Sequence, residues 1–366
     1  MEKARLSQPN PIAAATPPTG DAPIRVLVVD DSAFMRFAIT KCLSEATGIH
    51  VVATARDGIE ALELIKKLSP DVVTLDVEMP RLDGLATLRE IMANFPRPVI
   101  MLSSLTTEGS RETIQALTYG AVDFIPKPDI KANINAIMDS LVEKIRRAAR
   151  ARVFALPQRQ AVQPPPQPSV SKRTRPLSKC DRVVVIGSST GGPRALNMVV
   201  PLLPRDLPAA LLIVQHMPVG FTRSLAERLD SESEISIKEA DPGDALEVGR
   251  GLVAPGGFHM VLDANGKIAL NQNPPVHGVR PSVDVTMASV AQHFGPSAIG
   301  VILTGMGNDG TNGAALIRSA GGYVIAEDES TCVVWGMPRS VVEAGVANAV
   351  LPLPQIAQAI TKMITR

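Results

Sequence analysis

Apolar runs rich in Val, Ile and Leu alternate with stretches of helical length over two separate parts of the chain. In the first part, such runs occupy residues 24–29, 51–53, 72–75, 99–102 and 124–125. Strands that alternate with helices predict a parallel sheet, because each crossover between parallel strands needs a helix-length connection. The first part is therefore expected to form a doubly wound α/β domain with five strands.

A second α/β alternation begins at Arg182. Its apolar runs are typical of buried parallel strands and lie at residues 183–186, 210–214, 298–303 and 323–326. Between residues 234 and 272 the helical period fades, and turns such as Asn265–Gly266 predict an antiparallel excursion that contains a hairpin. We expect a second, larger doubly wound domain that is Rossmann-like and carries this hairpin.

A basic, proline-rich segment separates the two alternations. Residues 146–179 contain nine Lys or Arg, no Asp or Glu, and a run of three prolines. This composition favours a solvated, semi-extended linker, and a basic arm that contacts an acidic surface is the alternative. The proline-rich start of the chain has no apolar periodicity. We therefore predict a disordered tail (1–22), a first domain (23–141), a linker (142–178) and a second domain (179–366).

The composition excludes several classes of protein. A length of 366 residues suits two domains, and 45% hydrophobic with 20% charged residues is ordinary for a soluble globular protein. The net charge of +1 gives no reason to expect a nucleic-acid partner. The three cysteines are far apart, and no apolar run approaches the ~18 residues of a membrane span. These features predict a cytoplasmic protein with reduced thiols and without membrane insertion.

Acidic residues follow two of the predicted strands in the first domain. Asp30 and Asp31 come directly after the first apolar run, and Asp76 comes directly after the third. Ligands of open α/β sheets bind beyond the carboxyl ends of the strands, and clustered carboxylates suit Mg²⁺. A serine (Ser103 or Ser104) ends the fourth run, and Lys127 ends the fifth. A carboxylate, a metal, a hydroxyl and an ammonium at one rim can take up a phosphoryl group as an acyl phosphate.

The stretches VLVVDDS, LDVEMPRLDG, MLSS and DFIPKP are similar to those of two-component receiver domains. The resemblance covers about residues 23–141 and implies a five-stranded, flavodoxin-like domain. It also implies that Asp76 accepts a phosphoryl group, while Asp30, Asp31 and Asp76 hold Mg²⁺. The residues that respond to the phosphoryl group in this family match Ser103, Phe124 and Lys127.

A turn of small residues follows the first strand of the second domain. Gly187, Ser189 and Gly191 fit the G-x-S-x-G pattern, in which a turn between a strand and a helix exposes a serine. The N–H groups at the start of such a helix also bind phosphate. On this pattern alone, phosphate binding and hydrolysis are equally supported.

A histidine and an aspartate also follow predicted strands of the second domain. His216 comes after the run at 210–214, and Asp309 comes after the run at 298–303. If these strands are neighbours of the one before Ser189, the three side chains converge on one rim. They are the groups that acyl transfer requires, because a hydroxyl attacks, an imidazole carries the proton and a carboxylate orients the imidazole.

Other assignments remain open at this point. His259 and His277 compete with His216, although they lie in the turn-rich region. Asp309 lies in a glycine-rich stretch and could be a turn or N-cap residue. The chain order Ser, His, Asp also differs from that of α/β-hydrolases, so a different fold is expected.

The stretches IGSSTGGP, VQHMP-x-GFT, APGG-x-H and LTGMGNDG resemble the catalytic domain of the CheB chemotaxis methylesterase family over about residues 180–366. By position in these stretches, Ser189 is the nucleophile, His216 the general base and Asp309 the orienting carboxylate. The family commonly has Ala where this chain has Ser188, so the assignment depends on register. Backbone N–H groups of Thr190, Gly191 or Met306 are candidates for the oxyanion hole.

The resemblance implies a phosphorylation-regulated hydrolase that removes methyl groups from glutamates of methyl-accepting chemoreceptors and deamidates receptor glutamines. A chemotaxis histidine kinase would be the phosphodonor, and the esterase reaction would need no cofactor. A DNA-binding regulator is disfavoured, because its output would be a helix-turn-helix of ~70–100 residues with a basic face. A nucleotide-binding output is disfavoured, because GSSTGG lacks the G-x-G-x-x-G spacing.

Overall fold

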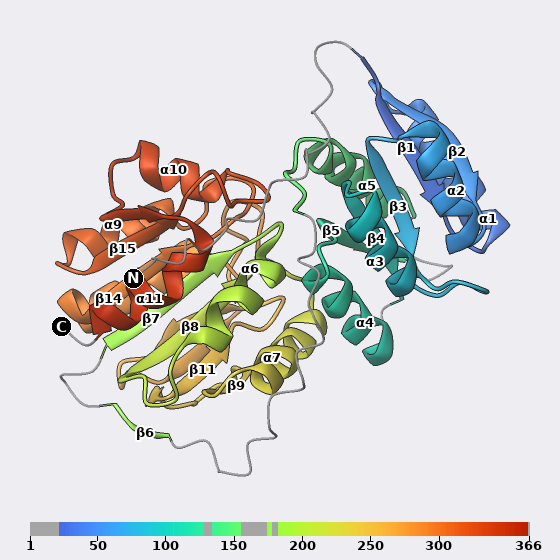
Figure 1. Ribbon diagram of the computed structural model, residues 1–366. Helices are drawn as coiled ribbons and strands as arrows, with labels where there is room; N and C mark the ends of the chain where they lie inside the picture. Colours follow the sequence, from blue (N-terminus) through green and yellow to red (C-terminus); the bar gives the residue numbers. More distant parts are fainter. Residues whose placement is uncertain (1–21, 105, 128–133, 155–173, 178–181, 365–366) are drawn as a thin grey trace, which may run out of the picture. The chain divides into compact units, whose positions relative to one another are not determined.

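The computed structural model describes residues 22–104, 106–127, 134–154, 174–177 and 182–364 (Figure 1). The chain divides into two compact units, residues 1–102 with 119–161, and residues 103–118 with 162–366. Each unit has its own parallel sheet. No helix among the described residues is both long enough and apolar enough to cross a membrane.

A five-stranded sheet forms the N-terminal α/β part of the chain. Its strand order is β2-β1-β3-β4-β5, the flavodoxin-like order, and the recorded pairings of β1 with β2 and β3, and of β3 with β4, are parallel. The strands are β1 (Ile24–Val29), β2 (Ile49–Ala55), β3 (Val72–Asp76), β4 (Val99–Ser103) and β5 (Asp123–Pro126). The helices between and after them are α1 (Ala33–Glu45), α2 (Gly58–Leu68), α3 (Gly84–Asn94), α4 (Thr107–Thr118) and α5 (Ile134–Ala148). The prediction of a five-stranded doubly wound domain is confirmed.

Local sequence explains where these elements begin and end. Every residue of β3 and β4 is buried, as expected for β-branched runs in the middle of a parallel sheet. The side chains of Ser32, Asp57 and Asp83 each accept a hydrogen bond from an N–H group in the first turn of the helix that follows. Asp57 and Asp83 therefore act as N-caps of α2 and α3.

The helix α5 continues beyond residue 141, where the sequence suggested the end of the first domain. Leu141, Ile145 and Ala148 lie on one face of the helix and are buried, so apolar packing extends the helix into the predicted linker. Further along that predicted linker, β6 (Arg175–Pro176) pairs antiparallel with β10 (Glu247–Val248). The predicted tail and the middle of the linker lie outside the described residues.

The second unit contains a seven-stranded sheet in which every recorded pairing is parallel. Its order is β16-β15-β14-β7-β8-β11-β9. The strands, in this order, are β16 (Ala349–Leu351), β15 (Tyr323–Glu327), β14 (Ala298–Ile302), β7 (Arg182–Ser188), β8 (Ala209–Gln215), β11 (Arg250–Val253) and β9 (Ser236–Glu239). The first strand in the sequence is thus at the centre of the sheet. The chain extends the sheet on one side of β7 and later on the other.

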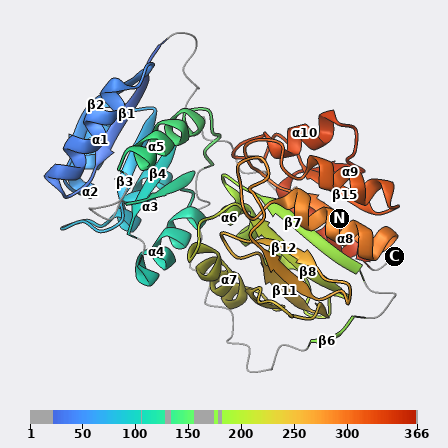
Figure 2. The same cartoon turned by 180° about the vertical axis from the view of Figure 1, so that it is seen from behind.

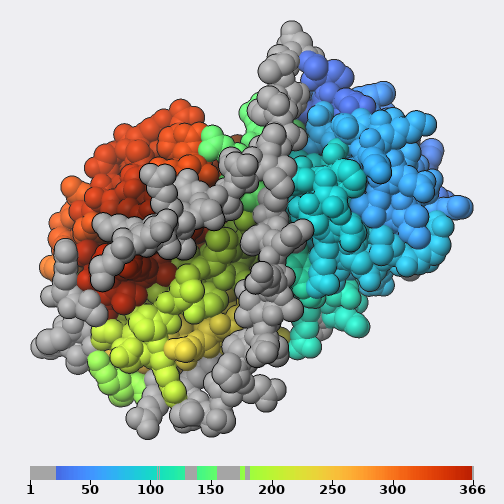
Figure 3. Space-filling view, in the orientation of Figure 1, coloured from blue at the N-terminus to red at the C-terminus, as the bar shows by residue number. Residues whose placement is uncertain are grey.

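Helices cover both faces of this sheet (Figures 1 and 2). One face carries α6 (Gly192–Val199), α7 (Phe221–Glu232) and α11 (Leu353–Ile364), and the surfaces of α6 and α11 adjoin in Figure 3. The other carries α8 (Val283–Phe294) and α9 (Thr311–Ser319), with α10 (Met337–Glu343) near β15. Two 3-10 turns, η1 (Val200–Leu202) and η2 (Gly295–Ser297), follow α6 and α8. This is the doubly wound arrangement expected from the alternation of strands and helices.

The region between residues 234 and 272 contains more than the predicted antiparallel excursion. Within it β10 pairs antiparallel with β6, but β9 and β11 are parallel strands at one side of the main sheet. The expected hairpin does form, from β12 (His259–Leu262) and β13 (Ile268–Asn271), with Asn265–Gly266 in its turn. Four-residue strands between glycine-rich turns give too short a pattern to reveal parallel pairing.

A steric test of the five-stranded domain is available at Gly84, the first residue of α3. A Cβ atom there would lie 2.1 Å from the backbone oxygen of Asp76, which no side-chain rotation can relieve. We expect Gly84→Ala to lower the free energy of unfolding by about 3 kcal/mol, the upper part of the range for overpacking. Gly48→Ala is the control, because that site has φ +80° and open space. It should cost about 1 kcal/mol in urea unfolding, and equal losses would contradict the steric account.

Candidate functional site

Three carboxylates gather at the carboxyl end of the five-stranded sheet. One oxygen from each of Asp30, Asp31 and Asp76 lies within 4.8 Å of the others. The Nζ atom of Lys127 is 3.0 Å from Asp30 Oδ2 and 2.6 Å from Asp76 Oδ2. Asp30 and Asp76 are buried, whereas Asp31 is exposed. The structure therefore brings together four of the residues that the sequence singled out.

The electrostatics of this cluster are consistent with a cation site. Burial, with the neighbouring charges of Asp30 and Asp31, raises the pKa of Asp76 to about 6 although Lys127 opposes the shift. Burial would lower the pKa of Lys127, but its contacts with Asp76 and Asp30 outweigh burial and raise it. Three carboxylates face one ammonium, so the cluster holds excess negative charge. Hard oxygen ligands in this number fit Mg²⁺.

Ser103 and Phe124 occupy the positions expected from their strands. Ser103 ends β4, is buried, and donates its hydroxyl hydrogen bond to the backbone oxygen of Gly109, 3.0 Å away, while Thr113 donates to Ser103. Phe124 lies buried in β5, with Lys144 Nζ 5.2 Å from its ring centroid. The Ser103 hydroxyl is thus directed into α4.

In the second unit, Ser189, His216 and Asp309 follow three neighbouring strands. Ser189 comes after β7, His216 after β8 and Asp309 after β14, and β7 pairs with both of the others. The carboxyl ends of parallel strands meet at one edge of a sheet, so the three residues follow strands that end at the same edge.

His216 and Asp309 form a close pair. His216 Nε2 is 2.7 Å from Asp309 Oδ2, and both side chains are largely buried. Since Nε2 faces the carboxylate, Nδ1 is the ring nitrogen available to a hydroxyl. The chymotrypsin arrangement uses the opposite nitrogens. Ser189 is partly exposed, and within the described residues its hydroxyl has no hydrogen-bond partner. Catalytic hydrogen bonds are often long before substrate binds.

The first turn of α8 holds the Asp309 carboxylate in place. Val283 N and Asp284 N donate to it at 2.7 and 3.0 Å, and the Ser282 hydroxyl donates at 2.8 Å. Burial alone would raise the pKa of Asp309, but the hydrogen bond and charge of His216, with the two amide donors, lower it below its usual value. The carboxylate is therefore ionised. The alternative of an N-cap aspartate is partly right, because Asp309 accepts hydrogen bonds from the first turn of α8 although the helix that follows it in the chain is α9.

The two adjacent serines differ in burial and in the partners of their hydroxyl groups. Ser188 is fully buried and donates its hydroxyl to Gln215 Oε1 at 2.7 Å. Ser189 is only partly buried, and its backbone N–H donates to the oxygen of Thr304. A substrate can reach Ser189 more readily than Ser188.

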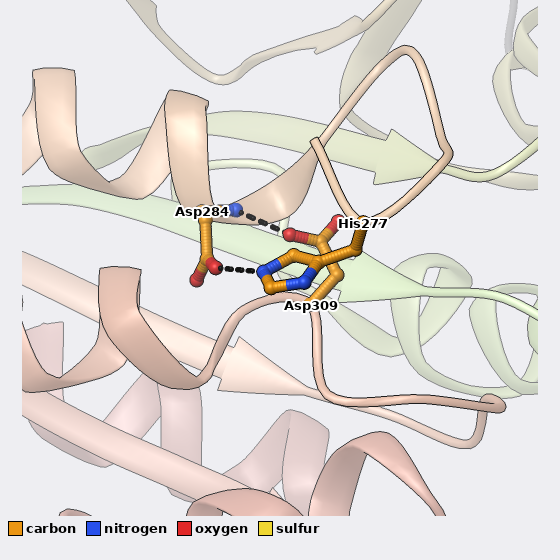
Figure 4. A group of neighbouring side chains, drawn as sticks. All are labelled: His277, Asp284 and Asp309. Atoms are coloured by element: carbon orange, nitrogen blue, oxygen red, sulfur yellow. Dashed lines mark hydrogen bonds and ion pairs between the residues drawn. The ribbon is translucent and has the colours of Figure 1, made fainter. Parts of the chain in front are cut away.

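The two competing histidines have other partners. His259 is fully buried, accepts a hydrogen bond from Ser282 N at 3.2 Å and has its other ring nitrogen 3.2 Å from the Pro274 oxygen. His277 Nε2 lies 3.0 Å from Asp284 Oδ2 (Figure 4). Ser282, which joins His259 to Asp309, was not singled out from the sequence. Its position directly before a helix was the available signal.

His277, Asp284 and Asp309 also meet the distance criterion for a metal site, with ligand atoms within 4.8 Å of one another (Figure 4). The Asp309 carboxylate, however, already accepts hydrogen bonds from three donors of α8, from Gly310 N and from His216. A carboxylate has about four lone-pair positions. No lone pair of Asp309 remains for a cation, so this group is not a metal site.

The oxyanion candidates lie beside Ser189. Gly191, with φ +78°, caps α6, and Met306 follows Gly305, which packs against Ser189. Among the described residues, the N–H groups of Gly191 and Met306 have no acceptor. Thr190 accepts a hydrogen bond from Thr304 through its backbone oxygen. Two backbone donors are therefore available next to the serine.

Comparison with known proteins adds to this geometry. Residues 184–360 match the CheB methylesterase family, and residues 26–139 match the response regulator receiver domain. A protein-glutamate methylesterase/protein-glutamine glutaminase of Symbiobacterium thermophilum is 55% identical over 93% of this chain and 97% of its own length. One of the same name from Pyrococcus horikoshii is 47% identical over 93% of this chain and 94% of its own length.

A crystal structure of the Thermotoga maritima CheB methylesterase catalytic domain is 50% identical, covers 50% of this chain and 99% of that chain, and gives a TM-score of 0.49. The two full-length relatives align over both of the units described above. The chain therefore belongs to the CheB methylesterase family, with a response regulator receiver domain before the methylesterase domain.

Proposed function

We propose that this protein is a phosphorylation-regulated protein-glutamate methylesterase that also deamidates glutamines, and that it acts on chemoreceptors in the cytoplasm. The single observation that carries the esterase chemistry is the His216–Asp309 pair, 2.7 Å apart, at the strand end next to Ser189. Methanol released from a methylated receptor, and ammonia released from its glutamines, test the proposal. Release of neither product would overturn it.

In the proposed reaction, the Ser189 hydroxyl attacks the γ-carbonyl of a methyl-glutamate, and His216 Nδ1 accepts the hydroxyl proton. Asp309 stabilises the imidazolium through Nε2. The tetrahedral intermediate collapses as His216 returns the proton to the departing methoxide, which leaves as methanol. Water then attacks the acyl-enzyme by the same route, with His216 as the base, and frees the glutamate and Ser189. A glutamine side chain would lose ammonia instead of methanol.

Charge that develops on the carbonyl oxygen needs donors that are already in place. The N–H groups of Gly191 and Met306 are suitable, and Thr190 remains a candidate. The esterase reaction needs no metal in this scheme, because a serine, an imidazole and backbone donors supply its nucleophile, base and electrophile.

The receiver part is proposed to take a phosphoryl group from a chemotaxis histidine kinase onto Asp76. Asp30, Asp31 and Asp76 would hold Mg²⁺, which neutralises charge on the transferred group. Lys127 contacts Asp76 directly and would contact the phosphoryl group in the same way. Ser103 and Phe124 are proposed to change position in response.

Phosphorylation at Asp76 should raise the rate of methanol release. A phosphoryl group changes the charge at the receiver rim and so can shift the equilibrium between an inactive and an active conformation. Each tenfold rise in the ratio of active to inactive protein requires about 1.4 kcal/mol of free-energy difference between the two conformations. We expect acetyl phosphate to stimulate the full-length protein, to leave Asp76→Asn unstimulated, and to leave a fragment of residues 174–366 unaffected. The fragment should already be fast if the receiver inhibits. Equal rates in all cases would contradict regulation by the receiver and would indicate that the receiver only binds the enzyme to its partners.

A further inference from the structure

The side chain of Gln215 connects the two residues that exchange a proton in the proposed reaction. Gln215 ends β8, is 2% exposed, and directly precedes His216. Its Nε2 donates to the backbone oxygen of Ser189 at 2.9 Å and to that of His216 at 3.2 Å. Its Oε1 accepts the Ser188 hydroxyl at 2.7 Å. Each polar atom of this buried amide therefore has a partner.

These contacts bridge two loops from neighbouring strands. Among the described residues, the recorded backbone hydrogen bond between these loops runs from His216 N to the Ser188 oxygen, at 3.1 Å. The Gln215 amide adds a second connection, which reaches the backbone of Ser189 itself. It is tightly enclosed, since a Cβ atom on Gly192 would lie 1.9 Å from Gln215 Oε1. A fully satisfied buried polar network of this kind is rigid.

The orientation of the amide is also fixed. The backbone oxygens of Ser189 and His216 can only accept hydrogen bonds, so they must face the NH₂ group of Gln215. The Oε1 atom of Gln215 must therefore face Ser188. The Ser188 hydroxyl supplies a donor at that side, which an alanine could not. This gives Ser188 a role that does not involve nucleophilic attack.

We propose that Gln215 is a positioning residue for the hydrolase reaction, and that it sets the separation of the Ser189 hydroxyl and the His216 ring with the help of Ser188. The inference rests on the proposed function. Ser189 and His216 have no hydrogen bond to each other among the described contacts, so the framework around them determines how they approach. A misplacement of about 1 Å can cost roughly 10²-fold in rate.

Gln215→Met tests this role, because methionine has a similar length and no hydrogen-bonding amide. We expect kcat to fall about 100-fold with KM unchanged within about twofold, since the substrate-binding surface stays in place. Ser188→Ala removes one of three contacts and should lower kcat about twofold. The double variant should be no slower than Gln215→Met alone, because both changes act on one network.

The same set of variants provides the control for a loss of folding. Gln215→Met leaves the buried Ser188 hydroxyl without an acceptor, whereas the double variant replaces both partners with apolar groups and is expected to melt at the higher temperature. If Gln215→Met does not fold, the double variant therefore carries the test. Gln358→Met, at an exposed position of α11, is the matched control and should keep normal kinetics.

A serine-directed fluorophosphonate separates this inference from the proposed function. Its rate of reaction with Ser189 depends on proton transfer to His216 but requires no receptor, so it should fall in parallel with kcat. A Gln215→Met or double variant that folds and reacts with the probe at the normal rate would overturn the inference. A normal probe rate in the unaltered protein without methanol or ammonia release would overturn the proposed function alone.

Discussion

Methanol release from a methylated receptor is expected to fall by about 10⁴–10⁶-fold in Ser189→Ala, the range for loss of a triad nucleophile in serine hydrolases. The hydroxyl oxygen of Ser189 forms the bond to the substrate carbonyl that gives the acyl-enzyme in the proposed reaction. The change removes one oxygen of a partly buried residue that has no recorded hydrogen-bond partner among the described residues, so folding should be unaffected. Single-turnover assays with receptor-bearing membranes, together with a thermal melt, measure both quantities.

The matched control is Ser188→Ala, which alters the adjacent residue by the same single atom. Its hydroxyl is buried against Gln215, so it can contribute to positioning but not to attack. We expect the rate to stay within about threefold of that of the unaltered protein. If Ser188→Ala were the inactive variant and Ser189→Ala the active one, the assignment of the nucleophile would be wrong.

Loss of either partner of the His216–Asp309 pair should have the second-largest effect. His216→Ala removes the proposed base, and Asp309→Ala removes the group that orients it, so each should lower kcat by about 10⁴-fold. Combining either change with Ser189→Ala should add little, because residues that act as one unit are strongly non-additive. A further large loss in the combined variant would show that the residues act independently.

Asp309 needs its own control, because its carboxylate also accepts hydrogen bonds from Ser282, Val283 and Asp284. Asp309→Ala leaves these buried donors unpaired, at a cost of about 1–3 kcal/mol for each. Asp309→Asn keeps an oxygen acceptor and removes the charge, so it should melt at a higher temperature than Asp309→Ala and remain slow. Near-normal methanol release by both variants would exclude Asp309 and point to Asp284 or Asp328.

The longer strands of both units could be predicted from sequence, and the short strands of the seven-stranded sheet could not. Runs of five to seven buried residues such as β3, β8 and β14 leave a clear apolar pattern. The strands β9, β11 and β16 have only three or four residues, and their parallel pairing depends on neighbours far along the chain. No local pattern carries that information.

The candidate site shows the same division. Residues that follow long strands, such as Ser189 and Asp309, could be placed at one rim because parallel strands share an edge. The supporting residues could not, because Ser282, which directly precedes α8, lies 27 positions before Asp309 in the chain. The choice between Ser188 and Ser189 also required burial, since the G-x-S-x-G pattern says nothing about which hydroxyl is enclosed.

The central position of β7 has a consequence for the order in which the second unit folds. Val183 pairs with Ala210 of β8 on one side and with Ala298 of β14 on the other. The entropy lost on closing a loop grows with its length, and contacts between distant residues slow folding. The β7–α6–β8 segment can therefore assemble early, whereas β14 must close a much longer loop. A partly folded chain would therefore hold the proposed nucleophile and base before the carboxylate that orients the base is in place.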